Sequence, residues 1–520
     1  RHPHRDFGGL TMNSLTILGL LPLVGSAAVF LLPKGSDLLA KQVALGVSIV
    51  VAIAGLGMAL SFDRSATGFQ FVEKYQWIPA FGINYALGVD GISLLLILLA
   101  LILTPIVIAA CWNEAEGGRW SVKNFFGLIL ILETMIVGVF AATDIFLFYV
   151  FFEAMLIPVY FLIGGYGTGE KAAAAVKFLL YSLFGGLLML ASIIGLYVIS
   201  GNQLGAPTFD ITALSQLTID PVTQRMLFLG FFIAFAIKAP LWPFHTWLPD
   251  AARAATPGTS VLLLGVLDKV GTYGMIRFCL SLFPEASKEF GPTIIVLSLI
   301  SIFYGAFLAI AQGTSSGDGN IKALISYTSI SHFGFITLGI FAFTQQSHSG
   351  ATLYMINHGF STAALFLIAG WMISRRKSER ISDFGGLQRV TPIMAWSFFI
   401  AGMSSLALPG LSSFVSEFLV LIGTFERYPI PAIIGTIGII LAALYILIPV
   451  QRALHGPTTP GNENLSDLTL REKISIAPVI AIIIFFGFYP QPLLDVINPA
   501  ANATLSALEI TGITGITGGK

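Results

Sequence analysis

The chain has 520 residues, of which 55% are hydrophobic and only 10% are charged, whereas soluble domains carry about 25% charged residues. Lysine plus arginine and aspartate plus glutamate number 27 each, so the net charge is zero and nothing indicates a nucleic-acid partner. Together with a mean hydropathy of +0.85, this composition excludes an ordinary soluble domain and predicts an all-α polytopic membrane protein.

The polar residues 1–11 precede the first apolar run and show no signal-peptide cleavage site, so we expect that run to be a retained helix. A membrane span needs about 20 apolar residues. Runs of this kind predict about fourteen helices, at 14–33, 41–62, 88–112, 121–141, 143–164, 173–200, 224–245, 256–281, 291–312, 320–343, 352–374, 391–423, 432–454 and 472–492.

Lysine and arginine gather in the loops that follow the odd-numbered spans, most densely in SRRKSER at 374–380. Loops rich in these residues stay on the cytoplasmic side of a membrane. The pattern therefore predicts that both termini lie on the outer side.

Two cysteines, Cys111 and Cys279, lie in different apolar runs and provide neither metal-ligand spacing nor a disulfide framework. The sequence contains no iron–sulfur, haem or dinucleotide motif. We therefore expect no redox cofactor in this chain.

Two predicted spans, the seventh and the twelfth, are interrupted by proline. The segment 231–251 contains Pro240 and Pro243, and the segment 401–423 contains Pro409. Proline-interrupted spans at matching places in two halves of a sequence are typical of transporters built from inverted repeats.

Ionisable side chains inside the predicted spans are the strongest functional signal. Each charged group at mid-membrane costs about 2.5–3.5 kcal/mol on the insertion scale, so a set of them points to function. The set is Glu133, Glu153, Lys238, Lys269, His332, His358 and Glu417. Individual acids and histidines could instead join helices or satisfy core polar groups. Their occurrence on successive helices favours a proton relay.

Lys238 is informative because a desolvated lysine can release its proton, whereas arginine stays charged. Pro240 lacks a backbone N–H and frees a carbonyl one turn back, near Lys238. Freed backbone at this depth must face protein or water. We therefore expect a polar pocket beside Lys238, extended by Pro243 and His245.

Several motifs, in order along the chain, resemble those of the antiporter-like membrane subunits of respiratory complex I, most closely the NuoM type. They are LGVDGIS (87–93), FYVFFEAMLIPVYFLIG (148–164), KAPLWPFHTWLPDA (238–251), IKALISYTSISHFGF (321–335), MINHGFSTAALF (355–366) and LPGLSSFVSEFL (408–419). The resemblance covers nearly all of the chain from residue 87 to the last predicted helix.

The resemblance implies fourteen helices with two inverted five-helix repeats, helices four to eight and nine to thirteen, and with helices seven and twelve broken. The corresponding units are 1–120 with the first three helices, 121–281 and 291–455 with the two repeats, and 456–520 with helix fourteen.

The resemblance also implies roles for single residues. Glu153 would pair with Lys238, and Lys269 would connect this pair to His332 and His358. Glu417 would be the exit group, and a glutamate there fits the NuoM type.

Auxiliary candidates for proton transfer are Glu133, His245, Lys322 and Asp268. The chain departs from the family at ARAATPGT (252–259) and at Asp268, where the family usually has an apolar residue. Adjacent helical residues lie about 100° apart, so we expect Asp268 to lie away from the relay.

From this resemblance we expect the chain to be a proton-translocating subunit of a bacterial NADH:quinone oxidoreductase. It would lie in the inner membrane between two paralogous antiporter-like subunits and in contact with lipid. NADH, FMN, iron–sulfur clusters and quinone are expected in partner subunits. Two alternatives stay open: a subunit of a multisubunit cation/proton antiporter or membrane-bound hydrogenase, and a structural spacer of the membrane arm.

Overall fold

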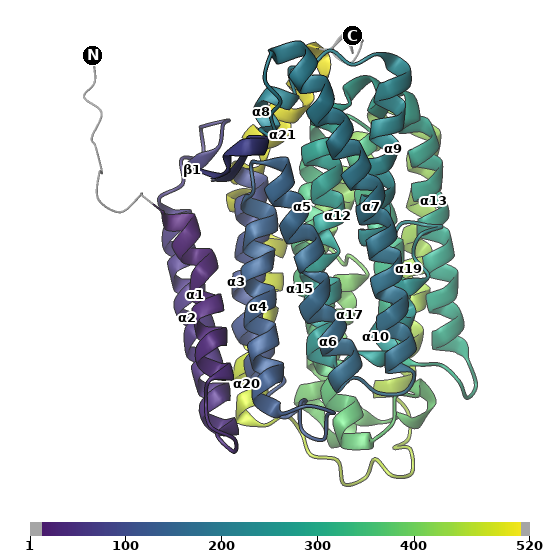
Figure 1. The fold of residues 1–520 in the computed structure, drawn as a ribbon. Helices are drawn as coiled ribbons and strands as arrows, with labels where there is room; N and C mark the ends of the chain where they lie inside the picture. Colours follow the sequence, from purple (N-terminus) through teal and green to yellow (C-terminus); the bar gives the residue numbers. More distant parts are fainter. Residues whose placement is uncertain (1–12, 511–520) are drawn as a thin grey trace.

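The computed structural model describes residues 13–510 and the side chains of residues 13–508 (Figure 1). The polar segment 1–11 lies outside the described residues, as does the C-terminal segment 511–520. The outer location of both termini therefore stays a prediction.

The described chain is mainly helical. Its first part comprises α1 (Ser14–Phe30), α2 (Asp37–Leu60), β1 (Gln70–Ile78), η1 (Pro79–Phe81), β2 (Ile83–Val89), α3 (Gly91–Ala110), α4 (Val122–Ala141), α5 (Ile145–Ala154), α6 (Leu156–Tyr166), α7 (Lys171–Leu204), α8 (Ile211–Leu214), α9 (Pro221–Lys238), α10 (Trp247–Ala254), α11 (Pro257–Leu262), η2 (Leu263–Leu267), α12 (Lys269–Gly274) and η3 (Met275–Leu280). Its second part comprises α13 (Pro284–Thr314), α14 (Ile321–Phe341), α15 (Gln345–Arg376), η4 (Ile381–Asp383), α16 (Leu387–Val390), α17 (Pro392–Ser405), α18 (Ser412–Arg427), α19 (Pro429–Leu454), α20 (Leu470–Phe488) and α21 (Gln491–Ile510).

Within residues 13–510, eleven helices are long and apolar enough to cross a membrane, or up to twelve if α20 and α21, bent by 72°, form one span. The multi-span prediction is therefore confirmed. The other predicted spans fall on α1, which has 17 residues, and on the interrupted pair α17–α18. The count of fourteen and the division into inverted repeats stay predictions.

One element departs from the all-helical prediction. β1 and β2 form an antiparallel hairpin that lies at one end of the bundle, together with α21 (Figure 1). Glu73 of β1 accepts a hydrogen bond from the backbone N–H of Leu15, so the hairpin holds the start of α1. We call this the hairpin end.

The opposite end carries the basic loops, and we call it the basic end. Lys123 donates to carbonyls at the end of α1, and Arg471 donates to Ala109 at the end of α3. Arg452 donates to Ser315 after α13. Three of the predicted cytoplasmic basic residues thus bind carbonyls at helix ends on this side of the molecule.

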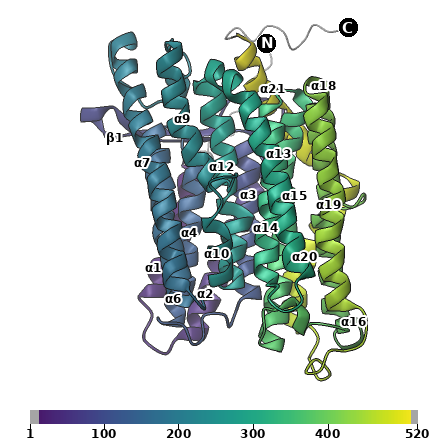
Figure 2. The ribbon, with the colours of Figure 1, turned by 90° about the vertical axis from the view of Figure 1, so that its right-hand side faces the viewer.

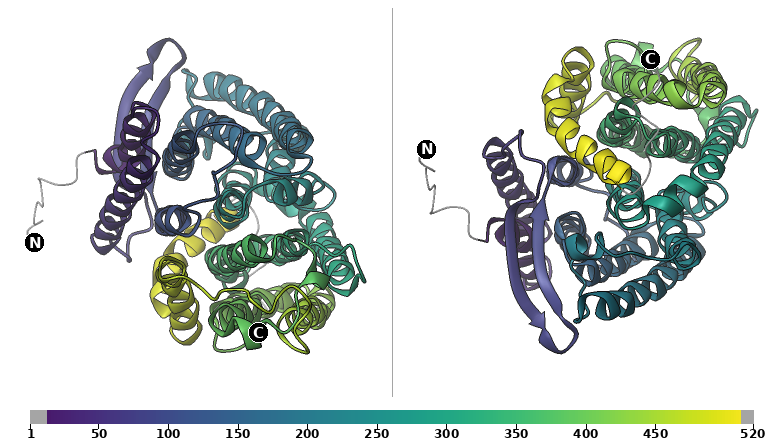
Figure 3. Two further views of the ribbon diagram at one scale, coloured as in Figure 1. Left: turned by 90° about the horizontal axis from the view of Figure 1, so that it is seen from below. Right: turned by 90° about the horizontal axis from the view of Figure 1, so that it is seen from above.

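α15 is the central helix of the second half. It contacts α3, α11, α14, α17, α18, α20 and α21, and nearly all of its residues from Ser347 to Met372 are buried. Figure 2 shows α7 and α19 flanking the helices between them, and the end views of Figure 3 show α1 and α2 at one edge of the bundle. Apolar side chains on the outer helices, such as Leu187 and Ile440, are exposed and suit contact with lipid.

Both predicted helix breaks are confirmed. α9 ends at Lys238 and the chain is non-helical until α10, while α17 ends at Ser405 and α18 begins at Ser412. The predicted fifth span is also interrupted, between α5 and α6. Pro158 explains this break, because it has no N–H to donate to the carbonyl of Ala154, where α5 ends.

Candidate functional site

Lys238 and Glu153 face a common region from two different helices. Lys238 is the last residue of α9, and its Nζ lies 4.5 Å from the ring centre of Phe152 on α5. Glu153 reaches toward α7, where a Cβ on Gly186 would lie 1.7 Å from its Oε1, so the glycine makes room for the carboxylate.

Neither Lys238 Nζ nor Glu153 Oε1 has a hydrogen-bond partner among the described residues. Among the described residues, these two atoms therefore form no hydrogen bond with each other. The expected pairing of their charges stays a proposal. An aromatic face attracts an ammonium group more weakly than an anion does, so Lys238 stays open to a further partner.

The backbone of the helix break does not behave as predicted. The N–H of Leu241 donates to the carbonyl of Ala236 at 2.9 Å, and the indole of Trp247 donates to Ile237 at 2.9 Å. The first of these bonds satisfies the carbonyl of Ala236, which Pro240 was expected to free beside Lys238. After Pro243, the ring of His245 packs edge-on against Tyr304 at 4.8 Å between centroids.

Lys269 lies at the centre of a closely connected cluster on the eighth predicted span. Two π-helical turns, η2 and η3, flank α12. Lys269 Nζ donates to the carbonyl of Leu264 in η2 at 2.7 Å. The same Nζ lies 2.7 Å from His358 Nδ1.

Asp268 requires a correction. We expected it to point away from the relay, yet its Oδ1 lies 3.0 Å from Lys269 Nζ, and both side chains are fully buried. The regular 100° step fails here because Asp268 lies at the junction between a π-helical turn and an α-helix. The Lys269 ammonium thus has three partners: a carboxylate, a carbonyl and an imidazole.

The two histidines lie on neighbouring helices, α14 and α15. The ring centroids of His332 and His358 are 5.4 Å apart. His358 Nδ1 faces Lys269, while its Nε2 lies 3.2 Å from the Ser329 hydroxyl and 3.1 Å from the Thr362 hydroxyl. Both ring nitrogens of His358 therefore have polar partners.

Tyr354 connects His332 to Glu417. Its hydroxyl lies 2.7 Å from His332 Nδ1 and donates to Glu417 Oε2 at 2.9 Å, and all three side chains are buried. Sequence reasoning missed this tyrosine. Its position one helical turn before His358 on α15 was a usable signal, because residues four apart share a helix face.

The remaining candidates lie apart from this cluster. Glu133 is buried on α4, and neither carboxylate oxygen has a hydrogen-bond partner among the described residues. Lys322 lies at the start of α14, where its Nζ pairs with Glu379 at 2.8 Å and donates to the carbonyl of Ala255 at 3.2 Å.

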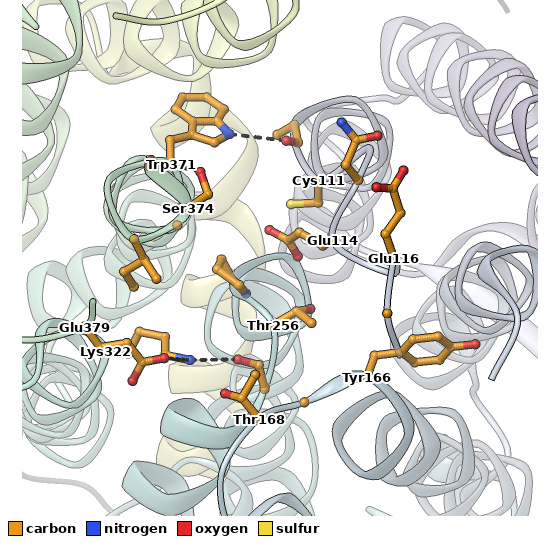
Figure 4. Close-up of a pocket in the computed structure, with 18 of the residues that line it drawn as sticks. Cys111, Glu114, Glu116, Tyr166, Thr168, Thr256, Lys322, Trp371, Ser374 and Glu379 are labelled. Atoms are coloured by element: carbon orange, nitrogen blue, oxygen red, sulfur yellow. Dashed lines mark hydrogen bonds and ion pairs between the residues drawn. The ribbon is translucent and has the colours of Figure 1, made fainter. Parts of the chain in front are cut away.

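Lys322 and Glu379 line a cavity of about 720 Å³ at the basic end (Figure 4). Glu114, in the loop after α3, accepts a hydrogen bond from the N–H of Gly258 at 2.9 Å. Burial raises the pKa of Glu114, while hydrogen bonds from Cys111 and from the Gly258 N–H act in the opposite direction.

These features define a class of protein: a polytopic membrane protein whose broken helices bring buried lysine, histidine and acidic side chains into a nearly continuous chain. Comparison with known proteins gives the family. Residues 142–443 match the family described as NADH:quinone oxidoreductase/Mrp antiporter, transmembrane, and the chain belongs to this family.

Two relatives show how close the match is. The chain is 49% identical to NADH-quinone oxidoreductase subunit M of Mycobacterium tuberculosis (strain ATCC 25618 / H37Rv), over 95% of this chain and 94% of the relative. It resembles a chain of respiratory complex I from Thermus thermophilus with bound NADH, with a TM-score of 0.85 and 29% identity, over 95% of this chain and 99% of the other.

A chain of the Mrp complex from Dietzia sp. DQ12-45-1b has the same fold, with a TM-score of 0.81. Identity is 20%, and the match covers 96% of this chain and 100% of the other.

Proposed function

We propose that this chain is the subunit-M-type, proton-translocating membrane subunit of a bacterial NADH-quinone oxidoreductase. The observation that carries the proposal is the buried chain from Lys269 through His358 and His332 to Tyr354 and Glu417. The identity to subunit M of such complexes supports the assignment to this enzyme.

In this proposal a proton on Lys269 Nζ passes to His358 Nδ1, which becomes protonated as the lysine becomes neutral. The imidazolium then passes a proton to His332, across the 5.4 Å between their ring centroids, through a bridging water or a ring rotation. Tyr354 accepts a proton from His332 Nδ1 as it gives its own to Glu417, so its hydroxyl is restored in the same step.

Glu417 then holds the proton until it leaves toward the hairpin end, which we place on the outer side together with both termini. Glu153 and Lys238 lie apart from the Lys269 cluster. Their proposed role is electrostatic: a change in the charge of this pair shifts the proton occupancy of Lys269, because charges interact strongly in a weakly polar interior.

The partners follow from this assignment. NADH, FMN, iron–sulfur clusters and quinone would be held by other subunits, and this chain would carry no cofactor. Two paralogous antiporter-like subunits would flank it, and lipid would cover the exposed apolar faces of helices such as α7 and α19.

A second candidate is a subunit of a cation/proton antiporter, because the Mrp chain has the same fold. Its 20% identity supports the fold alone. Neighbouring genes decide between the two, since flavin and iron–sulfur subunits accompany an NADH oxidoreductase. A pure spacer role is disfavoured, because buried charges that served no purpose would be costly.

The experiment is replacement of Lys238 in the complex reconstituted into liposomes. We expect Lys238→Ala to lose most NADH-driven proton pumping while the complex still assembles. Lys238→Arg should restore little, because arginine does not release its proton. Lys177→Ala is the control, because Lys177 is a partly exposed lysine paired with Asp250 at the basic end. Normal pumping by both Lys238 variants would refute the proposed function.

A further inference from the structure

The ammonium group of Lys238 has an unusual environment for a buried charge. The residue is 2% exposed, yet its Nζ has no hydrogen-bond partner among the described residues. A buried cation normally pairs with an anion, because the loss of its hydration is costly. Lys269, by contrast, has a carboxylate, a carbonyl and an imidazole around its Nζ. Another feature must therefore hold the Lys238 ammonium in place.

That feature is the ring of Phe152. Lys238 Nζ lies over this ring, 4.5 Å from its centroid, which is well inside the range of about 6 Å within which an aromatic face attracts a cation. The face of the ring is negative because of its quadrupole. The attraction is strongest where water is excluded, and Phe152 is buried as deeply as Lys238 is.

Other aromatic rings hold the Phe152 ring in a fixed position. The ring centroids of Phe148, one turn earlier on α5, and of Phe235 on α9 lie 5.7 and 6.1 Å from that of Phe152. Phe148 in turn lies 4.4 Å from Phe278 on η3. All four rings are buried. A ring packed in this way presents its face to the lysine at a constant place.

The same aromatic cluster packs against the helix that carries Lys269. A Cβ on Gly274 of α12 would overlap the ring of Phe235, and a Cβ on Gly271 would overlap the carbonyl of Phe235, so these glycines allow α12 to approach α9 closely. The rings make this region weakly polar. A charge held at Lys238 therefore acts on Lys269 with little screening, and its effect depends on where the charge lies.

Glu153 offers Lys238 a different position. It directly follows Phe152 on α5, and adjacent helical residues point about 100° apart. Its carboxylate lies against Gly186 of α7, and its Oε1 has no hydrogen-bond partner among the described residues. The ring and the carboxylate are thus separate sites for one ammonium group, and the structure places the ammonium over the ring.

We propose that Phe152 is a positioning residue of the relay: its ring holds the Lys238 ammonium apart from the Glu153 carboxylate and so sets the place from which this charge acts on Lys269. The inference rests on the proposed function, because it concerns a charge that this function uses. A cation–π contact away from water favours one position of the cation by about 30-fold. Weakening the contact should therefore reduce pumping several-fold.

The first test weakens the attraction of the ring and keeps the ring in place. Fluorine draws electrons away from the face, so phenylalanines that carry one, two and three fluorine atoms should bind the ammonium progressively less well at position 152. Each is introduced into the complex by amber-codon suppression and confirmed by the mass of this subunit. We expect NADH-driven pumping in proteoliposomes to fall at each step, several-fold for the trifluorinated ring.

Phe148 is the matched control. Its ring is buried on the same helix, and its recorded ring contacts are with other phenylalanines. The same three fluorinated residues at position 148 should leave pumping unchanged. Pumping that stays constant or rises along the series at Phe152, or that falls equally at both positions, would overturn the proposal.

The second test removes the rings. Phe152→Leu and Phe148→Leu take rings of the same size from the same cluster, but only the first takes a ring from Lys238. We expect Phe152→Leu to lose most of the pumping and Phe148→Leu to keep most of it, with electron transfer in the presence of an uncoupler as the measure of intact complex. Equal losses of pumping in the two variants would contradict the positioning role.

The positioning role and the proposed function can fail separately. A constant fluorine series together with loss of pumping in Lys238→Ala would reject the role of Phe152 and leave the relay in place. Normal pumping by Lys238→Ala and by Lys238→Arg would reject the proposed function itself, and the positioning role with it.

Discussion

Removal of the Tyr354 hydroxyl is the sharpest test of the buried chain. With a tetrahedral angle at the hydroxyl oxygen, the bonds of 2.7 and 2.9 Å place His332 Nδ1 and Glu417 Oε2 about 4.6 Å apart, too far for a direct hydrogen bond. In Tyr354→Phe no proton can pass directly between the two groups. Loss of a positioned proton carrier typically slows a step about 100-fold or more.

The same change costs some stability. Glu417 Oε1 has no hydrogen-bond partner among the described residues. Glu417 Oε2 accepts a hydrogen bond from the Tyr354 hydroxyl, and Tyr354→Phe would remove it. A buried group left unpaired costs about 1–3 kcal/mol, which is less than the stability of a typical domain. We therefore expect the complex to assemble in normal amounts.

The assay is NADH-driven acidification of proteoliposomes, with electron transfer in the presence of an uncoupler as the measure of intact complex. Tyr273→Phe is the control, because this buried tyrosine donates to the carbonyl of Phe140 and lies outside the chain. The reasoning fails if Tyr354→Phe pumps at the normal rate, or if Tyr273→Phe loses as much as Tyr354→Phe does.

Three further predictions use the same assay. Glu153→Gln and Lys238→Ala should be strongly non-additive, because they change one electrostatic unit; losses that simply add would show that the two groups act independently. Glu417→Lys should keep part of the pumping, since a titratable group remains, whereas Glu417→Ala and Glu417→Gln should lose most of it; near-normal pumping by the Gln variant would make this residue structural. Asp268→Asn removes the counter-charge 3.0 Å from Lys269 and should reduce pumping more than Asp268→Glu does. Equal activity of these two variants would show that the charge of Asp268 is dispensable.

Features that depend on short stretches of sequence were predicted well. The membrane spans follow from the lengths of the apolar runs. The breaks after Lys238 and before Ser412 lie at Pro240 and Pro409, as predicted, because proline removes a backbone hydrogen bond from a helix interior. The burial of Lys269, His332 and His358 also follows, because an ionisable group in the middle of a long apolar run has no route to water.

Prediction is weaker where local geometry departs from the regular helix. The contact of Asp268 with Lys269 depends on the π-helical turn before it, and apolar runs do not distinguish such a turn from an α-helix. The hairpin β1–β2 was missed because it lies between spans, in a segment where membrane hydropathy provides no signal.

Contacts between helices were decided by the tertiary structure. Tyr354 bridges His332 and Glu417 only because α14, α15 and α18 pack with these three residues at one level. The sequence predicts Lys322 as an auxiliary residue, and its place in the wall of a cavity was decided by packing, because α14 begins beside the end of α15. In a membrane, helix rotation and register are set by close packing and hydrogen bonds between helices, since lipid is as apolar as the helix surfaces. The sequence of each helix thus determines which groups are buried, and the packing of the whole bundle determines which of them meet.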